Sequence, residues 1–292
     1  MPLTVATKGP KHGACNICGD VGLLTEDHTP PKGWMRPTQV ELQHVVRALS
    51  AHATPKVKRT VSQNGVKYRT LCSRCNSSLL GHYYDPHLIA LANKTAELLT
   101  SSLHLPPTLS IATRPQPIMR SVLGHIAAQG VDRYRKGPHT EEFRDYILDC
   151  SLPFPEFLSM YSWAYPFRSQ VPVRDAGYID FGRQDPFLAW FIKCFPLAFL
   201  VTWDATPTFP FPVQTLDIWR DVPYDHEAEL PMALRPLPPE HWPEAPTDMS
   251  AIVYGTEAVV ARGLTLLSSG APPASRSAQT LGVRKRPSIA ST

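Results

Sequence analysis

The sequence lacks the features of a membrane-spanning or secreted chain. Its longest apolar run, residues 187–201, is interrupted by Lys193 and Pro196, and it stays short of the roughly 20 apolar residues that a membrane-spanning helix needs. The first eight residues contain no apolar segment typical of a signal peptide. The chain has only six cysteines, and four of them stand in two CxxC pairs, which fits reduced, metal-binding thiols better than a disulfide framework. We therefore expect a cytoplasmic or nucleoid-associated protein with no membrane partner.

A strong excess of charge is also missing, but the positive charge is concentrated in the first third of the chain. The net charge is +4 over 292 residues. Residues 1–90 contain eleven Lys and Arg against five Asp and Glu, which leaves 18 against 20 in the rest of the chain. A basic N-terminal segment joined to a near-neutral body favours a polyanionic partner for that segment.

Composition and patterning predict an α+β protein. The 43% of hydrophobic residues indicate a globular fold with a sizeable core, whereas 31 prolines argue against a long helical bundle. We expect a zinc module over residues 1–90 and a mixed body over 91–267, in which helices precede an antiparallel sheet. The last part, residues 268–292, is rich in Ser, Ala, Gly and Arg and is expected to be a disordered tail.

Local patterns predict the elements of the zinc module. Apolar and polar residues favour a strand through residues 23–28, and helical spacing favours a helix at 42–51. The stretch 56–70 alternates as a hairpin would, with its turn at Asn64-Gly65. A helix is expected to begin at Cys72 and to end near Gly81.

The body is expected to contain helices followed by strands. Apolar residues at helical spacing predict three helices, at 87–103, 118–134 and 140–148. Aromatic and β-branched runs predict three strands, at 157–165, 171–181 and 190–203. We expect the aromatic rings of these strands to lie in the core and not to form a platform for nucleobases.

Two CxxC pairs form the most specific pattern in the chain. Cys15 and Cys18 are separated by 53 residues from Cys72 and Cys75. Two such pairs supply the four thiolates of a tetrahedral structural Zn²⁺ site. Zinc at this place would fasten the start of a β-hairpin to the start of a helix, as in a treble-clef finger, and would stabilise a module too small to fold on its core alone.

Asp27, His28 and Asn76 supply the side chains of a hydrolytic metal centre. A histidine can act as general base on a water at neutral pH, and a carboxylate is a simple hard ligand for Mg²⁺. Asn76 directly follows Cys75, so zinc would fix its position, and its amide oxygen can ligate a metal. Because neighbouring side chains of a strand point to opposite faces, we expect a turn or bulge at residues 29–31 to re-aim Asp27 or His28.

The order of these motifs resembles the HNH endonucleases over residues 15–85. The resemblance rests on four segments: Asp27-His28-Thr29-Pro30-Pro31, Leu71-Cys72-Ser73-Arg74-Cys75-Asn76, Leu80-Gly81 and Tyr84-Asp85. It implies a ββα-metal finger that hydrolyses phosphodiester bonds of double-stranded DNA with Mg²⁺ or another divalent cation. By this resemblance His28 is the general base, Asp27 and Asn76 hold the catalytic cation, and His82 or Asp85 is a candidate for a further ligand.

Two positions depart from the family pattern. Lys67 stands where the family usually has its middle Asn, so that Asn64 is the nearest substitute, and Leu80 stands where a further ligand can occur. Five basic side chains of the module are expected to contact flanking phosphates without reading sequence: Lys56, Lys58, Arg59, Lys67 and Arg69.

Other functions are also compatible with the sequence. The first alternative is a non-catalytic, zinc-organised module that binds nucleic acid or protein. A weaker one is an independent enzyme within residues 150–220, where the carboxylates show no catalytic spacing. On the nuclease interpretation, we expect the body to position the site and not to supply chemistry.

Overall fold

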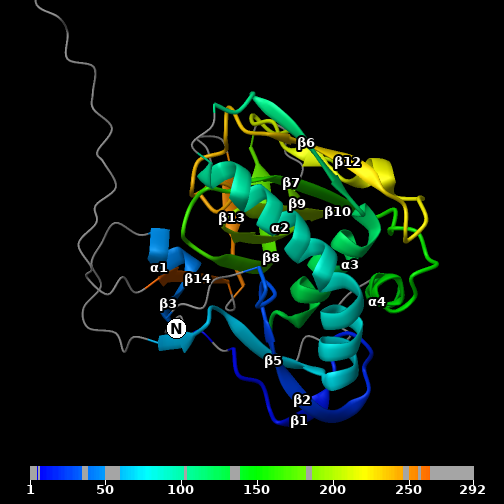
Figure 1. The fold of residues 1–292 in the computed structure, drawn as a ribbon. Helices are drawn as coiled ribbons and strands as arrows, with labels where there is room; N and C mark the ends of the chain where they lie inside the picture. Colours follow the sequence, from blue (N-terminus) through cyan, green and yellow to red (C-terminus); the bar gives the residue numbers. More distant parts are fainter. Residues whose placement is uncertain are drawn as a thin grey trace, which may run out of the picture.

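The fold is mixed α+β, with antiparallel sheets and few helices (Figure 1). The structure is a computed structural model, and it describes residues 5, 7–34, 39–49, 60–101, 104–131, 139–181, 186–245, 250–255 and 258–263. The expected tail at 268–292 therefore lies outside the described residues. Among the helices that are described, none combines the length and the apolar character that crossing a membrane requires.

The N-terminal sheet has the strand order β1-β2-β5 and is antiparallel throughout. It consists of β1 (His12–Ala14), β2 (Val21–His28) and β5 (Lys67–Cys72). After β5 the chain enters the helix η1 (Arg74–Tyr84), which continues without a break into α2 (Asp85–Thr100). The strand expected at 23–28 is confirmed. The predicted helix end near Gly81 is wrong, because Gly81 does not take the left-handed conformation of a helix cap.

A second small sheet joins segments that are far apart in the sequence. Its order is β14-β3-β4, with β3 (Gln39–His44), β4 (Thr60–Gln63) and β14 (Val259–Gly263). Of the helix expected at 42–51, the described residues contain α1 (Val45–Leu49), and residues 50–51 lie outside them. Residues 39–44 form a strand instead, because burial alternates along them and places Val40 and Leu42 in the core.

The turn at Asn64-Gly65 is correct, but the hairpin around it is wrong. Both residues have positive φ, 61° for Asn64 and 84° for Gly65, as a tight turn requires. The flanking strands nevertheless pair with different partners: β4 pairs with β3, and β5 pairs with β2. The choice of partner depends on strands that are distant in the sequence, which a local pattern does not contain.

The body is built on a six-stranded antiparallel sheet in the order β11-β7-β10-β9-β8-β13. Its members are β7 (Leu158–Ala164), β8 (Val171–Asp180), β9 (Pro186–Cys194), β10 (Leu197–Trp203), β11 (Gln214–Thr215) and β13 (Ser250–Val253). Strands 157–165 and 171–181 are confirmed within a residue or two. The strand expected at 190–203 is instead a hairpin that turns between Cys194 and Leu197.

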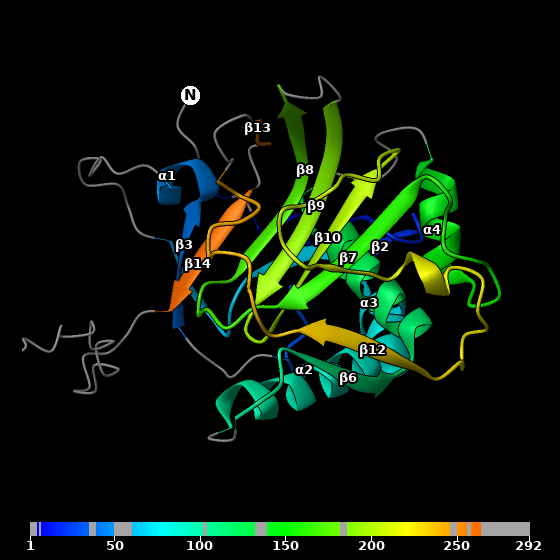
Figure 2. The same cartoon turned by 90° about the horizontal axis from the view of Figure 1, so that it is seen from above.

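Helices cover one face of this sheet (Figure 2). The helix α3 (Pro115–Ala128) packs on β8 and β9, and α2 and α4 (Thr140–Leu148) pack on α3. Beside them lie a two-stranded ribbon of β6 (Thr108–Thr113) and β12 (Ala228–Ala233) and the short helix η2 (Asp217–Trp219). The predicted helix 140–148 is confirmed with its bounds.

One hydrophobic cluster connects the N-terminal sheet to the body. It contains Cys75 and Leu80 from η1 together with Ile118 from α3 and Phe199 from β10. The expected boundary at residue 90 falls inside α2, and buried side chains from both sides of it share this cluster. The body strands contribute buried rings at Tyr161, Trp163 and Trp190, and Tyr165 directly after β7 is also buried, as expected, whereas Phe181 directly after β8 is exposed.

Candidate functional site

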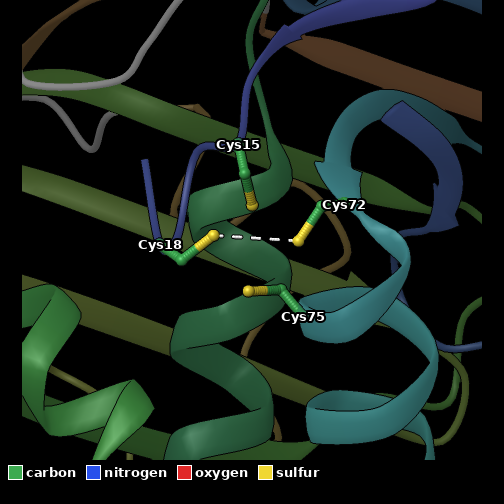
Figure 3. A group of neighbouring side chains, drawn as sticks. All are labelled: Cys15, Cys18, Cys72 and Cys75. Carbon is green, nitrogen blue, oxygen red and sulfur yellow. Dashed lines mark hydrogen bonds between the residues drawn. The ribbon is translucent and has the colours of Figure 1, made fainter. Parts of the chain in front are cut away.

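The four cysteines of the CxxC pairs lie together (Figure 3). Cys15 and Cys18 come from the turn between β1 and β2, Cys72 ends β5, and Cys75 lies in the first turn of η1. Their sulfur atoms are all within 4.8 Å of one another, and Cys18 Sγ and Cys72 Sγ are 3.7 Å apart. Tetrahedral Zn–S bonds of about 2.3 Å place sulfur atoms about 3.8 Å apart. The donor set and its spacing therefore fit a metal such as zinc.

The body also holds the first knuckle in place. Asn16 Nδ2 donates to Ala127 O at 2.9 Å and to Gly130 O at 3.0 Å, at the end of α3. Arg144 of α4 donates to the carbonyls of Ile17 and Cys18. The bonds from Arg144 satisfy carbonyls of the knuckle, and those from Asn16 satisfy carbonyls at the end of α3; together they fix the cysteines relative to α3 and α4.

Asp27 and His28 occupy the last two positions of β2. They stand opposite Tyr68 and Lys67 of β5, in a ladder whose only register shift lies between Thr25 and Glu26. The observed bulge precedes both residues, and the turn or bulge expected at residues 29–31 is present only as a bend at residues 29 and 30, directly after His28. It does not interrupt the alternation of the strand, so Asp27 and His28 point to opposite faces of β2. Asp27 points inward and is buried, while His28 is half-buried on the side of Lys67.

Asn76 links η1 to this strand. Its Nδ2 donates to Thr25 Oγ1 at 2.9 Å and to the carbonyl of Glu26 at 3.1 Å. A carbonyl only accepts, so the nitrogen of the amide must face β2. The orientation of the Asn76 amide is thereby defined, and its oxygen is left for another partner.

The carboxylate of Asp27 bonds His125, a residue that belongs to none of the sequence motifs. His125 Nδ1 lies 2.9 Å from Asp27 Oδ2, and His125 Nε2 lies 3.0 Å from Asp85 Oδ1. Ser121 Oγ donates to the same Asp85 oxygen at 2.7 Å, and Thr29 Oγ1 donates to Asp27 Oδ2 at 3.3 Å. The only signal in the sequence was a histidine within an apolar helix, a position that is usually an isolated core residue.

The two carboxylates determine the charge of His125. Burial lowers the pKa of this imidazole, but Asp27 and Asp85 outweigh burial and raise its pKa to about 10. The ring is therefore protonated at neutral pH and donates from both nitrogens, as two acceptor carboxylates require. Asp27 and Asp85 thus share the positive charge of the buried His125 ring.

His28 has the opposite character. Burial is the main cause that lowers its pKa below 6.5, and the positive charge of Lys67 lowers it further. The ring is consequently neutral at pH 7. The Nε2 atom of His28 is buried and has no hydrogen-bond partner among the described residues.

The remaining candidates are placed as follows. His82 is exposed on η1 and packs against the Tyr83 ring. Arg69 Nη2 is 3.1 Å from Glu26 Oε1, so its charge is already paired, whereas Lys67 lies directly across from His28. The other expected phosphate contacts lie outside the described residues: Lys56, Lys58 and Arg59.

Leu80 packs against α3, which explains why a leucine stands at a helix position where the resemblance allows a further metal ligand. It is fully buried and faces Gly124 of α3, where an added Cβ would lie 2.3 Å from Leu80 Cδ2. The glycine allows α3 to approach η1 closely. His125, the next residue, is thereby brought to Asp27 and Asp85.

Among the described residues, the four cysteines are the only group of three or more His, Cys, Asp or Glu side chains with ligand atoms close enough to share a metal. Comparison with known proteins identifies no relative, since no family model, no curated protein and no solved structure matches the chain.

Proposed function

We propose that the protein is a metal-dependent endonuclease of the HNH type, built on a ββα-metal, treble-clef finger that cuts double-stranded DNA. His28 is the general base, and Asp27 and Asn76 hold a divalent cation such as Mg²⁺. The four cysteines hold a structural Zn²⁺. The order of elements supports this assignment, because β2 and β5 pair antiparallel and the chain then enters η1 directly.

The contact between Asn76 and β2 carries the proposal. Asn76 Nδ2 bonds the carbonyl of Glu26, the residue that directly precedes Asp27 and His28. Cys75, next to Asn76, would fasten the same helical turn to zinc. The backbone segments that carry the three proposed catalytic residues therefore adjoin at one junction of strand and helix, and a zinc ion on the cysteines would hold that junction.

Oxygen atoms suited to a divalent cation are available at this junction. Both hydrogen bonds that Asp27 accepts from described residues end on Oδ2, so Oδ1 is left for a ligand. The nitrogen of the Asn76 amide is used by two acceptors, so its Oδ1 is left as well. Carboxylate and amide oxygens are hard ligands that Mg²⁺ accepts. When bound, such a cation stabilises negative charge on the scissile phosphate.

The protein side chains would activate the water and hold the substrate. A neutral His28 accepts a proton from a water that attacks phosphorus. Lys67 lies opposite His28 on the same face of the β2–β5 pair. Its ammonium group would contact a phosphate beside the cleaved bond, which adds affinity without sequence preference.

A plasmid-nicking assay with and without Mg²⁺ tests the proposal. We expect Mg²⁺-dependent conversion of supercoiled DNA, lowered by about 10²-fold or more in His28→Ala, as removal of a general base predicts. His226→Ala is the matched control, because His226 is an exposed histidine of the body, and it should nick at the wild-type rate. Equal rates for wild type and His28→Ala would remove the proposed mechanism.

A non-catalytic module that binds nucleic acid is the second candidate. Two observations favour it: the Asp27 carboxylate is buried and engaged by His125, and Lys67 replaces an Asn expected from the resemblance. In that case the protein should shift DNA in a salt-dependent gel assay, lose affinity in Lys67→Met, and leave the plasmid intact at every Mg²⁺ concentration.

A further inference from the structure

The continuous helix formed by η1 and α2 is connected to β2 by two separate sets of hydrogen bonds. Asn76 bonds β2 directly. Asp85, nine residues later at the start of α2, reaches it through His125, which bonds both Asp85 and Asp27. These bonds form a closed circuit of strand, helix, Asp85, His125 and Asp27. The relative position of Asp27 and Asn76 is consequently set by more than the zinc knuckles.

The winding of η1 makes this circuit possible. Nine residues correspond to about 2.5 turns of α-helix, which would place Asn76 and Asp85 on opposite faces. Residues Arg74–Tyr84 are instead wound as a π-helix, with an i→i+5 bond from the Asp85 amide to Leu80 O. At about 4.4 residues per turn, nine residues complete about two turns. Asn76 and Asp85 therefore face the same side, toward β2 and α3.

We propose that His125 is a positioning residue for the divalent-cation site: it holds Asp27 Oδ2 so that Oδ1 is presented beside the Asn76 amide oxygen. Asp85 and Ser121 in turn hold the ring of His125. The inference rests on the proposed function, since it takes Asp27 as a ligand of that cation. It assigns part of the site to α3, a helix of the body outside residues 15–85.

Burial and bonding support a positioning role. The side chains of His125 and Asp27 are 1% and 3% exposed, so neither can turn to solvent. A carboxylate whose one oxygen accepts two hydrogen bonds loses rotational freedom, and ordering a ligand before binding raises its affinity for metal. Without His125, the Asp27 carboxylate could rotate, and the orientation of its Oδ1 atom would no longer be fixed.

Two substitutions at His125 separate the two bonds of its ring. In His125→Asn the amide nitrogen takes the place of Nδ1 and keeps the bond to Asp27. In His125→Gln the amide nitrogen takes the place of Nε2 and keeps the bond to Asp85. Both variants remove the imidazole and its charge, so only the bond that is retained distinguishes them.

Binding of Mn²⁺, followed by the electron paramagnetic resonance signal of the free ion, measures the effect without any need for cleavage. We expect His125→Gln to weaken Mn²⁺ binding by about 10-fold or more, in the range typical of residues that orient metal ligands, and His125→Asn to weaken it less. Asp27→Ala should abolish the site. His44→Gln is the matched control, since His44 is another buried histidine and bonds Gly255 O; its Mn²⁺ affinity should equal that of wild type.

The outcomes distinguish this inference from the proposed function. Wild-type affinity in a folded, zinc-loaded His125→Gln overturns the positioning role alone. If Mn²⁺ binding by wild type is absent, or is unchanged in Asp27→Ala, the cation site and the positioning role are both overturned. If Mn²⁺ binds as expected but no DNA is cut, the nuclease assignment fails and the positioning role stands. Should His125→Gln lose its zinc, Asp85→Asn is compared instead, and an unchanged affinity again overturns the inference.

Discussion

A buried lysine in the centre of the large sheet offers a sharp test of how the body is held together. Lys193 of β9 is fully buried, and its Nζ is 2.5 Å from Glu244 Oε2. The same ammonium group donates to the carbonyls of Glu240 at 2.5 Å and Trp242 at 2.9 Å, and it lies 4.8 Å from the centre of the Tyr165 ring. One side chain therefore ties the proline-rich segment around residue 242 to the sheet.

Replacing Lys193 with methionine keeps the volume and removes every one of these bonds. The Glu244 carboxylate, itself 3% exposed, would be left buried without its cation. Breaking a buried ion pair at one partner costs about 3–5 kcal/mol, a large fraction of the 5–15 kcal/mol by which a protein of ordinary stability is folded. Glu244→Gln should cost less, because Lys193 keeps two carbonyl acceptors. The free energy of unfolding, measured in urea at pH 7, gives both values.

The double variant and the pH dependence complete this test. In Lys193→Met/Glu244→Gln no buried charge remains, so the loss should be at least about 2 kcal/mol smaller than the sum of the single losses. Burial raises the pKa of Glu244, and Lys193 opposes this. Without Lys193 the pKa of Glu244 rises further, so this carboxyl takes up a proton on folding, and its contribution to the stability of the variant is greatest at low pH and falls as pH rises. A loss below about 1 kcal/mol in Lys193→Met, or additive losses, would refute this reasoning.

Three further predictions concern the N-terminal sheet and α3. Cys72→Ser should lose zinc and should unfold β1, β2 and β5, because metal binding and folding are coupled. Elemental analysis measures the zinc, and hydrogen exchange measures the lost protection of the three strands. Retained zinc and retained protection would contradict the four-thiolate site. His125 is buried, yet its two carboxylate partners raise its pKa to about 10. The stability difference between wild type and His125→Gln should therefore be complete below about pH 6.5 and shrink as pH rises towards 10; a difference independent of pH would argue against a charged ring. Gly124→Ala should destabilise by about 1–3 kcal/mol, because its Cβ would overlap Leu80. In urea unfolding, Gly124→Ala/Leu80→Ala should lose less stability than the sum of the two single losses, because the shorter side chain removes the overlap.

Some features followed from the sequence alone because they depend on neighbouring residues. The two CxxC pairs predicted a four-cysteine site, and the structure gathers Cys15, Cys18, Cys72 and Cys75 within 4.8 Å. The turn at Asn64-Gly65 and the bounds of α4 were also predictable. In each case the signal is a short-range preference: ligand spacing, tolerance of positive φ, or the period of an amphipathic helix.

Strand pairing and helix continuation were decided by tertiary contacts. The strands on either side of Asn64-Gly65 joined different sheets, and β14 closed onto β3 from more than two hundred residues away. The helix that was expected to end at Gly81 continued, because η1 and α2 bury an apolar face against α3. Local propensity sets which conformations are accessible, and burial against distant partners selects among them.

The candidate site divides in the same way. Asp27, His28 and Asn76 could be proposed from their order and spacing, since the chemistry on which that prediction rests is local to each residue. His125 was not recognisable, because its role depends on carboxylates that are 98 and 40 residues away along the chain. A sequence lists which groups can ionise or donate, but only the packed structure decides which of them face one another in a medium where an unpaired charge is costly.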